Sequence, residues 1–117
     1  MTAYKLVRKA KDGKLYPLFI DRKRPYKIGE PRTAEYIPTN GFAARKGFHC
    51  CFVPFAPHLK ETLANGEHRV WIECDVDDYE TYDRPESQGG TWILAEKLQV
   101  IREVSQEEVR SILHERT

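Results

Sequence analysis

The chain has 117 residues, 40% of them hydrophobic and 32% charged, with a net charge of +1. This length and composition suffice for one domain with its own core and exclude an intrinsically disordered chain. The longest apolar runs are only a few residues, and the first twenty residues lack an apolar core, so we expect neither a membrane span nor a signal peptide. Three cysteines, two of them adjacent, form a poor disulfide framework, which predicts a cytoplasmic protein.

The first predicted element is a β-hairpin. Residues 4–10 and 14–20 flank Asp12-Gly13, and an Asp-Gly pair tolerates the positive φ angles of a tight hairpin turn. Pro17 cannot donate a ladder hydrogen bond, which indicates that the second strand lies at a sheet edge or starts irregularly. Residues 21–27, DRKRPYK, have the composition of a phosphate-contacting loop and equally of an ordinary exposed turn.

Residues 41–58, GFAARKGFHCCFVPFAPH, form the most unusual stretch of the chain. Turns are expected at Asn40-Gly41 and at Gly47, followed by a short buried element over 48–53 that is too short to assign to strand or helix. Residues 56–66 then predict a brief helix, with Pro57 in its first turn and Asn65-Gly66 at its end. An Asn-Gly hairpin is the alternative.

The second half of the chain predicts a sheet followed by a helix. Residues 69–76 alternate between apolar and polar and predict a strand, whereas the acidic residues 77–90 predict a long loop. Residues 91–104 predict one strand or two pieces. Ser105 and Glu108 have the spacing of a capping box, which starts a C-terminal helix at Gln106. The expected fold class is therefore α+β: a single domain over 1–117, with an antiparallel sheet, a short central helix and a C-terminal helix.

Two kinds of chemistry are considered for the cysteines and histidines. His49, Cys50, Cys51, His58 and Cys74 are all suitable zinc ligands. Adjacent cysteines on a strand point to opposite faces, however, and no pair has the spacing that pre-positions two ligands, so no metal and no cofactor is predicted. A thiol nucleophile activated by a neighbouring histidine is the other hypothesis, and buried free thiols are the ordinary alternative.

Four segments carry a resemblance to a known family: YKLVRKAKDGKLYPLFIDRKRPYKIGE, PTNGFAARKGFHCCFVPFAPHL, RVWIECDVDDYE and RPESQGGTWILAEKLQVIRE. Together they span most of residues 4–104 and resemble a family of small uncharacterised proteins encoded in bacteriophage and prophage genomes. The resemblance implies a phage accessory protein in the cytoplasm of a bacterial host, and it brings no catalytic residues. Binding and inhibiting a host macromolecule, such as a component of a defence system, is a common role for such proteins.

The charge distribution bears on the class of partner. Residues 1–70 carry 14 basic and 6 acidic side chains, a net charge of +8, whereas residues 71–117 carry 5 and 12, a net charge of −7. Attraction between the two halves within one fold explains this as well as a basic binding face does. Because aromatic and basic residues do not alternate elsewhere, we do not expect nucleic acid as the partner. The apolar runs are too short for a membrane span, and the family resemblance implies a host protein as the partner. The sequence leaves the oligomeric state open.

Binding residues are expected in the segments 41–58 and 77–90. Arg45, Lys46 and Arg84 offer cationic contacts, and Phe48, Tyr79 and Tyr82 offer aromatic surface. A small nucleotide or an NAD-derived ligand is the alternative, since Gly47-Phe48-His49 with a later Glu resembles ADP-ribosyltransferase-like folds, and a diverged enzyme of that kind stays open. The complete set of candidate binding residues is Arg45, Lys46, Phe48, His49, His58, Tyr79, Tyr82, Arg84, Glu86 and Gln88.

Overall fold

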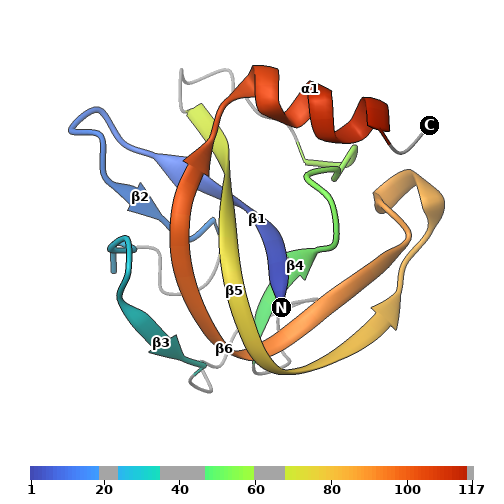
Figure 1. Cartoon of the computed structure of the whole chain (residues 1–117), viewed down its shortest axis with the longest axis horizontal. Coiled ribbons are helices and arrows are strands. Elements are labelled where there is room, and N and C mark those ends of the chain that lie inside the picture. Colours follow the sequence, from blue (N-terminus) through green and yellow to red (C-terminus); the bar gives the residue numbers. More distant parts are fainter. Residues whose placement is uncertain (19–23, 35–46, 60–67, 116–117) are drawn as a thin grey trace.

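The computed structural model of the chain describes residues 1–18, 24–34, 47–59 and 68–115. Figure 1 shows strands that curve around a common centre, with one helix across their upper side. The elements in chain order are β1 (Thr2–Lys9), β2 (Leu15–Tyr16), β3 (Pro31–Thr33), β4 (Phe48–Cys51), β5 (His68–Asp83), the 3-10 turn η2 (Glu86–Gln88), β6 (Thr91–Val104) and α1 (Gln106–Glu115).

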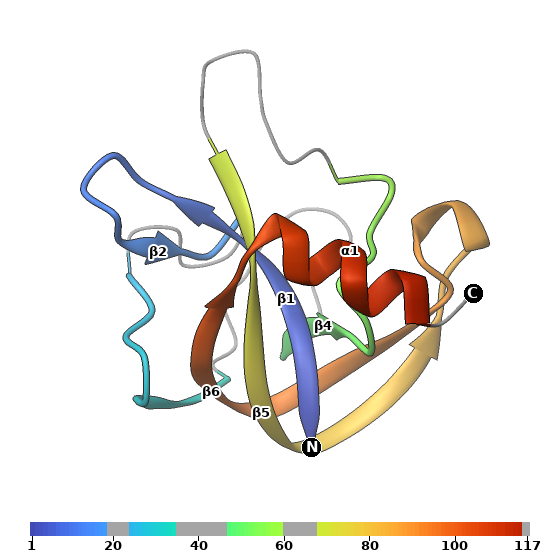
Figure 2. The same cartoon turned by 45° about the horizontal axis from the view of Figure 1, so that its top comes forward.

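The long β5–β6 hairpin organises the sheet. Its two strands pair from Trp71↔Val104 to Asp83↔Thr91, and Figures 1 and 2 show both strands bending sharply near their middle. Asp78, in the second half of β5, has a φ of 52°, in the left-handed region. A bulge in β6 leaves Ile101 without a partner on β5, because Glu73 pairs with Arg102 whereas Cys74 pairs with Val100.

The bend allows the sheet to close on itself. The first half of β5 pairs with β1, the first half of β6 pairs with β4, and β1 meets β4 at Tyr4↔Cys51. The hydrogen-bonded order β1–β5–β6–β4 therefore returns to β1. β2 pairs with the end of β1 beyond β4, and β3 pairs with β6 beyond β4. All of these pairings are antiparallel.

Side chains of alternating residues fill the inside of this closed sheet. Most of the interior side chains are small or β-branched, which suits the limited space inside a narrow closed sheet. Its buried members are Ala3, Val7, Leu15, Tyr26, Cys50, Ile72, Cys74, Val76, Ile93, Ala95, Leu98 and Val100, with Phe48 and Val70 packed against them.

A second apolar cluster lies on the outside of the sheet. Its buried members are Leu6, Leu18, Cys51, Ala56, Trp71, Trp92 and Val104. α1 and the segment that follows β4 cover this cluster, α1 through Val109 and Ile112 and the segment through Leu59. The two faces of the sheet therefore contribute to two different cores. The adjacent residues Cys50 and Cys51 illustrate this, because Cys50 lies in the interior core and Cys51 in the outer cluster.

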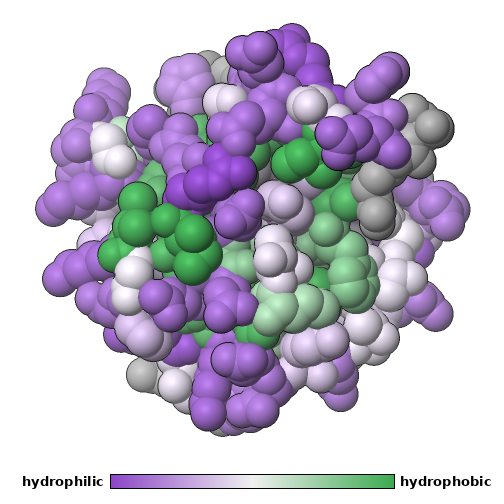
Figure 3. All heavy atoms as spheres, viewed as in Figure 1, coloured by the Kyte–Doolittle hydropathy of each residue, from purple (hydrophilic) through white to green (hydrophobic). Residues whose placement is uncertain are grey.

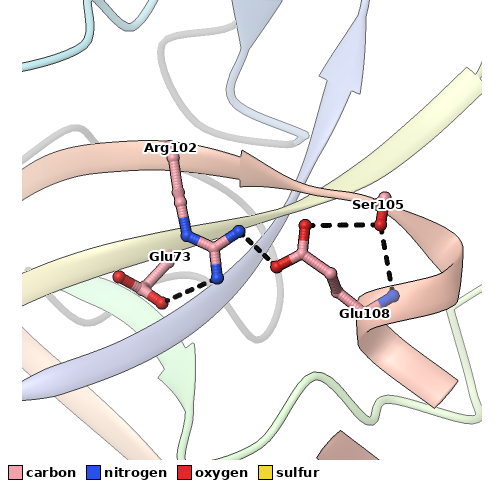
Figure 4. A network of polar contacts seen from close by, with 4 residues as sticks. All are labelled: Glu73, Arg102, Ser105 and Glu108. Atoms are coloured by element: carbon pink, nitrogen blue, oxygen red, sulfur yellow. Dashed lines mark hydrogen bonds and ion pairs between the residues drawn. The ribbon is translucent and has the colours of Figure 1, made fainter. Parts of the chain in front are cut away.

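Polar contacts fix the start of α1 (Figure 4). The Glu108 backbone amide donates to the Ser105 hydroxyl at 3.1 Å, as the capping-box spacing predicted. The Arg102 guanidinium bonds the Glu108 carboxylate and reaches the Glu73 carboxylate on β5 at 3.3 Å. This contact with Arg102 lowers the pKa of Glu108. The network joins β5, β6 and the first turn of α1.

The α+β fold class is wrong, because the described chain is dominated by an antiparallel sheet with one C-terminal helix. A short central helix was expected over 56–66, but Pro57–Leu59 form a turn, and 60–66 lie outside the described residues. Proline at the start of that segment suits a turn as well as a helix. The strand over 69–76, the first hairpin and the C-terminal helix from Gln106 are confirmed.

The expected acidic loop over 77–90 is also wrong. β5 continues to Asp83, and only the short segment 84–90 connects it to β6. The acidic residues that indicated a loop are exposed on a strand whose backbone is paired with β6, so pairing overrides their low β-propensity. Residues 91–104 form a single strand with one bulge.

No helix among the described residues is long and apolar enough to cross a membrane.

The packing of the interior predicts a large effect for Ile72→Ala. Ile72 is fully buried, so its truncation leaves a cavity and should lower the free energy of unfolding by about 2–5 kcal/mol. Ile101→Ala is the matched control, because Ile101 is 42% exposed at the bulge and should change the free energy by less than about 0.5 kcal/mol. Chemical denaturation measures both, and equal effects would contradict the assignment of the core.

The ion pair between Arg102 and Glu108 at the start of α1 predicts a pH-dependent effect of Glu108→Gln. A carboxyl group whose pKa is lowered on folding stabilises the fold above its unfolded pKa, and this contribution is lost as the pH falls through the folded value. Glu108→Gln should therefore lower the melting temperature at neutral pH, and the difference from wild type should shrink below about pH 4. Glu107→Gln, in the same helical turn, is the control, and an equal loss in it would contradict the role of Glu108.

Candidate functional site

Trp92 forms the centre of the cluster of polar and aromatic side chains at the end of the β5–β6 hairpin. Its indole ring is 5% exposed and its Nε1 donates to the Gln88 carbonyl at 2.7 Å. The Arg84 guanidinium lies 5.0 Å from the centroid of the ring, and the His58 ring lies 5.6 Å from it in an edge contact. A cation over the face of an indole ring is an attractive arrangement, so the contact with Trp92 helps to position Arg84.

Arg84 and Tyr82 extend the cluster across the sheet. The Arg84 Nε donates to the Gln88 side-chain oxygen at 3.0 Å, which ties the hairpin end together. His49 on β4 lies 2.8 Å from the Tyr82 hydroxyl through its Nδ1. Burial raises the pKa of Tyr82, although the charge of Arg84 and a hydrogen bond from it act in the opposite direction. Tyr82 is thus a neutral hydrogen-bonding group between His49 and Arg84.

The segment after β4, residues 52–59, packs against this hairpin end. Phe55 N donates to the Val53 carbonyl at 2.7 Å, and Leu59 N donates to the Ala56 carbonyl at 2.9 Å, so the segment makes two consecutive tight turns. Gly89, with a φ of 99°, approaches it so closely that a Cβ there would lie 2.9 Å from the Phe55 carbonyl oxygen. Only glycine combines this conformation with this contact.

The segment 52–59 also presents apolar side chains to solvent. Phe52 is 38% exposed and Phe55 is 45% exposed, and Pro57 and His58 are exposed beside them. Burial lowers the pKa of His58, and the positive charge of Arg84 adds to this effect. Figure 3 shows apolar surface among hydrophilic side chains, including a patch between α1 and the β5–β6 hairpin. The turn therefore combines exposed aromatic rings with a neighbouring cation.

The structure brings five of the predicted binding residues together: His49, His58, Tyr82, Arg84 and Gln88. Of the other described candidates, Phe48 packs against the interior of the closed sheet and Tyr79 is 45% exposed in the second half of β5. Glu86 lies in the same 3-10 turn as Gln88, where its side chain is exposed. Arg45 and Lys46 lie outside the described residues.

Sequence reasoning missed Trp92, Phe52 and Phe55. Trp92 lies in the strand predicted over residues 91–104, and no residue pattern in that strand indicates a contact of Trp92 with Arg84 and His58. Phe52 and Phe55 were included in the unusual stretch but not singled out. Their separation by Val53-Pro54 was the available signal, since a proline after a short apolar strand turns the chain and leaves neighbouring side chains at the surface.

The cysteines lack the properties of nucleophiles. Burial raises the pKa of Cys50 to about 11 and that of Cys51 to about 12, and it raises the pKa of Cys74 as well. All three are free thiols inside the two cores. In the part of the chain that the structure describes, no group of three His, Cys, Asp or Glu side chains could hold a metal ion.

Comparisons with known proteins found no relatives: no protein-family model, curated protein or solved structure matches the chain.

The burial of the thiols predicts slow labelling by a disulfide reagent. At pH 8 a pKa of about 11 in place of 9 leaves ~100-fold less thiolate, and burial also blocks access. The native protein should therefore react far more slowly than the same protein in denaturant, where three thiols should react. Fast labelling of one native thiol would contradict this and return the thiol-nucleophile hypothesis to consideration.

Proposed function

We propose that the protein is a phage accessory protein that binds and inhibits a host protein in the bacterial cytoplasm, without catalysis. The binding surface is the aromatic turn, which we define as Phe52, Phe55, Pro57 and His58 together with Arg84. The observation that supports this most directly is the exposure of two phenylalanine rings on a turn held against the hairpin end. The phage origin is supported by the resemblance of the four sequence segments.

The composition of the aromatic turn favours a protein partner. Aromatic residues and arginine are enriched where protein interfaces have their strongest contacts. A pre-organised turn loses little conformational entropy on binding, which favours affinity. Here the two tight turns and the contact with Gly89 fix the backbone, while Trp92 fixes the ring of His58 and the guanidinium of Arg84.

A structural role for the polar groups supports binding rather than catalysis. The thiols are buried with raised pKa values, and Arg84 is engaged by Trp92 and Gln88. His49 and Arg84 approach each other through Tyr82, whereas Glu86 lies exposed in η2. A nucleotide or NAD-derived ligand would need these three groups around one space, so we do not favour that alternative.

The aromatic turn predicts a selective loss of partner binding. The tagged protein carrying Phe52→Ala and Phe55→Ala should lose a host protein that the wild type retains from a bacterial lysate, because the variant removes the exposed apolar contacts. Ile28→Ala is the matched control, since Ile28 is 65% exposed on a different segment and should leave capture unchanged.

Two measurements complete this test. The melting temperatures of the variants must match that of wild type, because exposed side chains should contribute little to stability. Native mass spectrometry of the protein purified from its host then examines the alternative. A stoichiometric nucleotide on the wild-type protein, or equal capture by the double variant and the Ile28 control, would overturn the proposal.

A further inference from the structure

The edge of β5 that faces away from β6 holds another described strand along only half of its length. β1 pairs with this edge from His68 to Asp75, and Met1 then exchanges two backbone hydrogen bonds with Val76, at 2.9 and 3.1 Å. No strand among the described residues pairs with the same edge beyond Val76. We call residues 77–83 of β5 the open edge.

The open edge is a regular and exposed piece of strand. Its pairing with β6 keeps one register from Asp77 to Asp83. The side chains of five consecutive residues, 77–81, are exposed, whereas a strand covered on one face alternates between buried and exposed side chains. Figures 1 and 2 show the second half of β5 at the margin of the molecule, with β6 on its inner side. A strand at the margin of a sheet directs alternate N–H and C=O groups outward, which provides a template for a further strand.

The charge of the open edge is of one sign. Residues 77–83, DDYETYD, contain four acidic side chains and no basic one. Of these acids, Asp78 also contacts Lys97 on β6 at 3.3 Å, with both side chains more than half exposed. β1, which occupies the first half of the same edge, has the opposite composition, with three basic side chains and no acidic one. Because opposite charges across a strand pair are favourable and like charges are unfavourable, the open edge favours a basic strand and disfavours a second copy of itself.

We propose that the open edge binds an extended basic segment of a partner protein, which joins the sheet as a further strand antiparallel to β5. In this mode of recognition backbone hydrogen bonds provide affinity and alternate side chains provide specificity. The added strand lies in line with β1, beyond Met1, because both strands pair with the same edge of β5. The site shares no residue with the aromatic turn and does not rest on the function proposed for it.

The first experiment uses a peptide of defined sequence as the probe. The capped peptide TAYKLVRK, the sequence of β1, is added to the ¹⁵N-labelled full-length protein at low ionic strength. Backbone amide resonances of residues 78–83 should shift saturably. The amides of this stretch that face away from β6 should exchange fast in the free protein and slowly in the complex. Protection of these amides in the free protein, or peptide-induced shifts that spare residues 78–83, would overturn the proposal.

Two control peptides separate strand addition from simple attraction between charges. The first has glutamate in place of the three basic residues, so it keeps the backbone and reverses the charge. The second keeps the three basic residues and has proline in place of the tyrosine and the valine, so it lacks two backbone donors and cannot form a regular ladder. Neither peptide should cause a saturable shift. A shift from the proline peptide equal to that from TAYKLVRK would reveal charge attraction alone and would overturn the added strand.

The second experiment changes the charge of the open edge. The variant Asp77→Asn with Asp78→Asn should lower the affinity for TAYKLVRK by about 2- to 30-fold, because it removes two acidic partners, while asparagine still tolerates the left-handed conformation of Asp78. Glu107→Gln with Glu115→Gln removes two exposed acidic charges from α1 and should leave the affinity unchanged. An equal loss in both variants would overturn the proposal. Because neither variant alters the aromatic turn, a failure here leaves the binding proposed for that turn unaffected.

Discussion

The bend in the β5–β6 hairpin is the constraint on which the other contacts depend. A straight hairpin would leave β1 and β4 on opposite edges of a flat sheet, whereas the bend brings the two edges together so that Tyr4 pairs with Cys51. Closure gives every strand of the ring an inside and an outside. The inside must be filled by small and branched side chains, and the outside needs a second cover, which α1 and residues 52–59 supply.

The candidate binding surface follows from this two-sided arrangement. Trp71 and Trp92 of the long hairpin both belong to the outer cluster, which α1 and the segment after β4 help to cover. The aromatic turn lies where that segment meets the hairpin end, with His58 against Trp92 and Phe55 beside Gly89.

The opposite charges of the two halves of the chain meet within the fold. The N-terminal ammonium group lies 2.8 Å from the Asp75 carboxylate, and Lys9 lies 3.0 Å from Glu103 at the end of the sheet. Both pairs join the basic first half to the acidic second half, as expected for strands that come from the two halves and lie side by side. These two contacts are examples of the attraction between the two halves that the sequence predicted.

The sequence by itself determined the elements whose signals are local. Asp12-Gly13 specified the first turn, the alternation of 69–76 specified a strand, and Ser105 with Glu108 specified the start of α1, because turn, pleat and cap depend on residues a few positions apart. Only the tertiary structure decided that the acidic residues after Val76 continue a strand, since that depends on pairing with β6. It also decided that Trp92 gathers Arg84 and His58. That contact joins segments whose approach is set by the closure of the sheet, which no local pattern encodes.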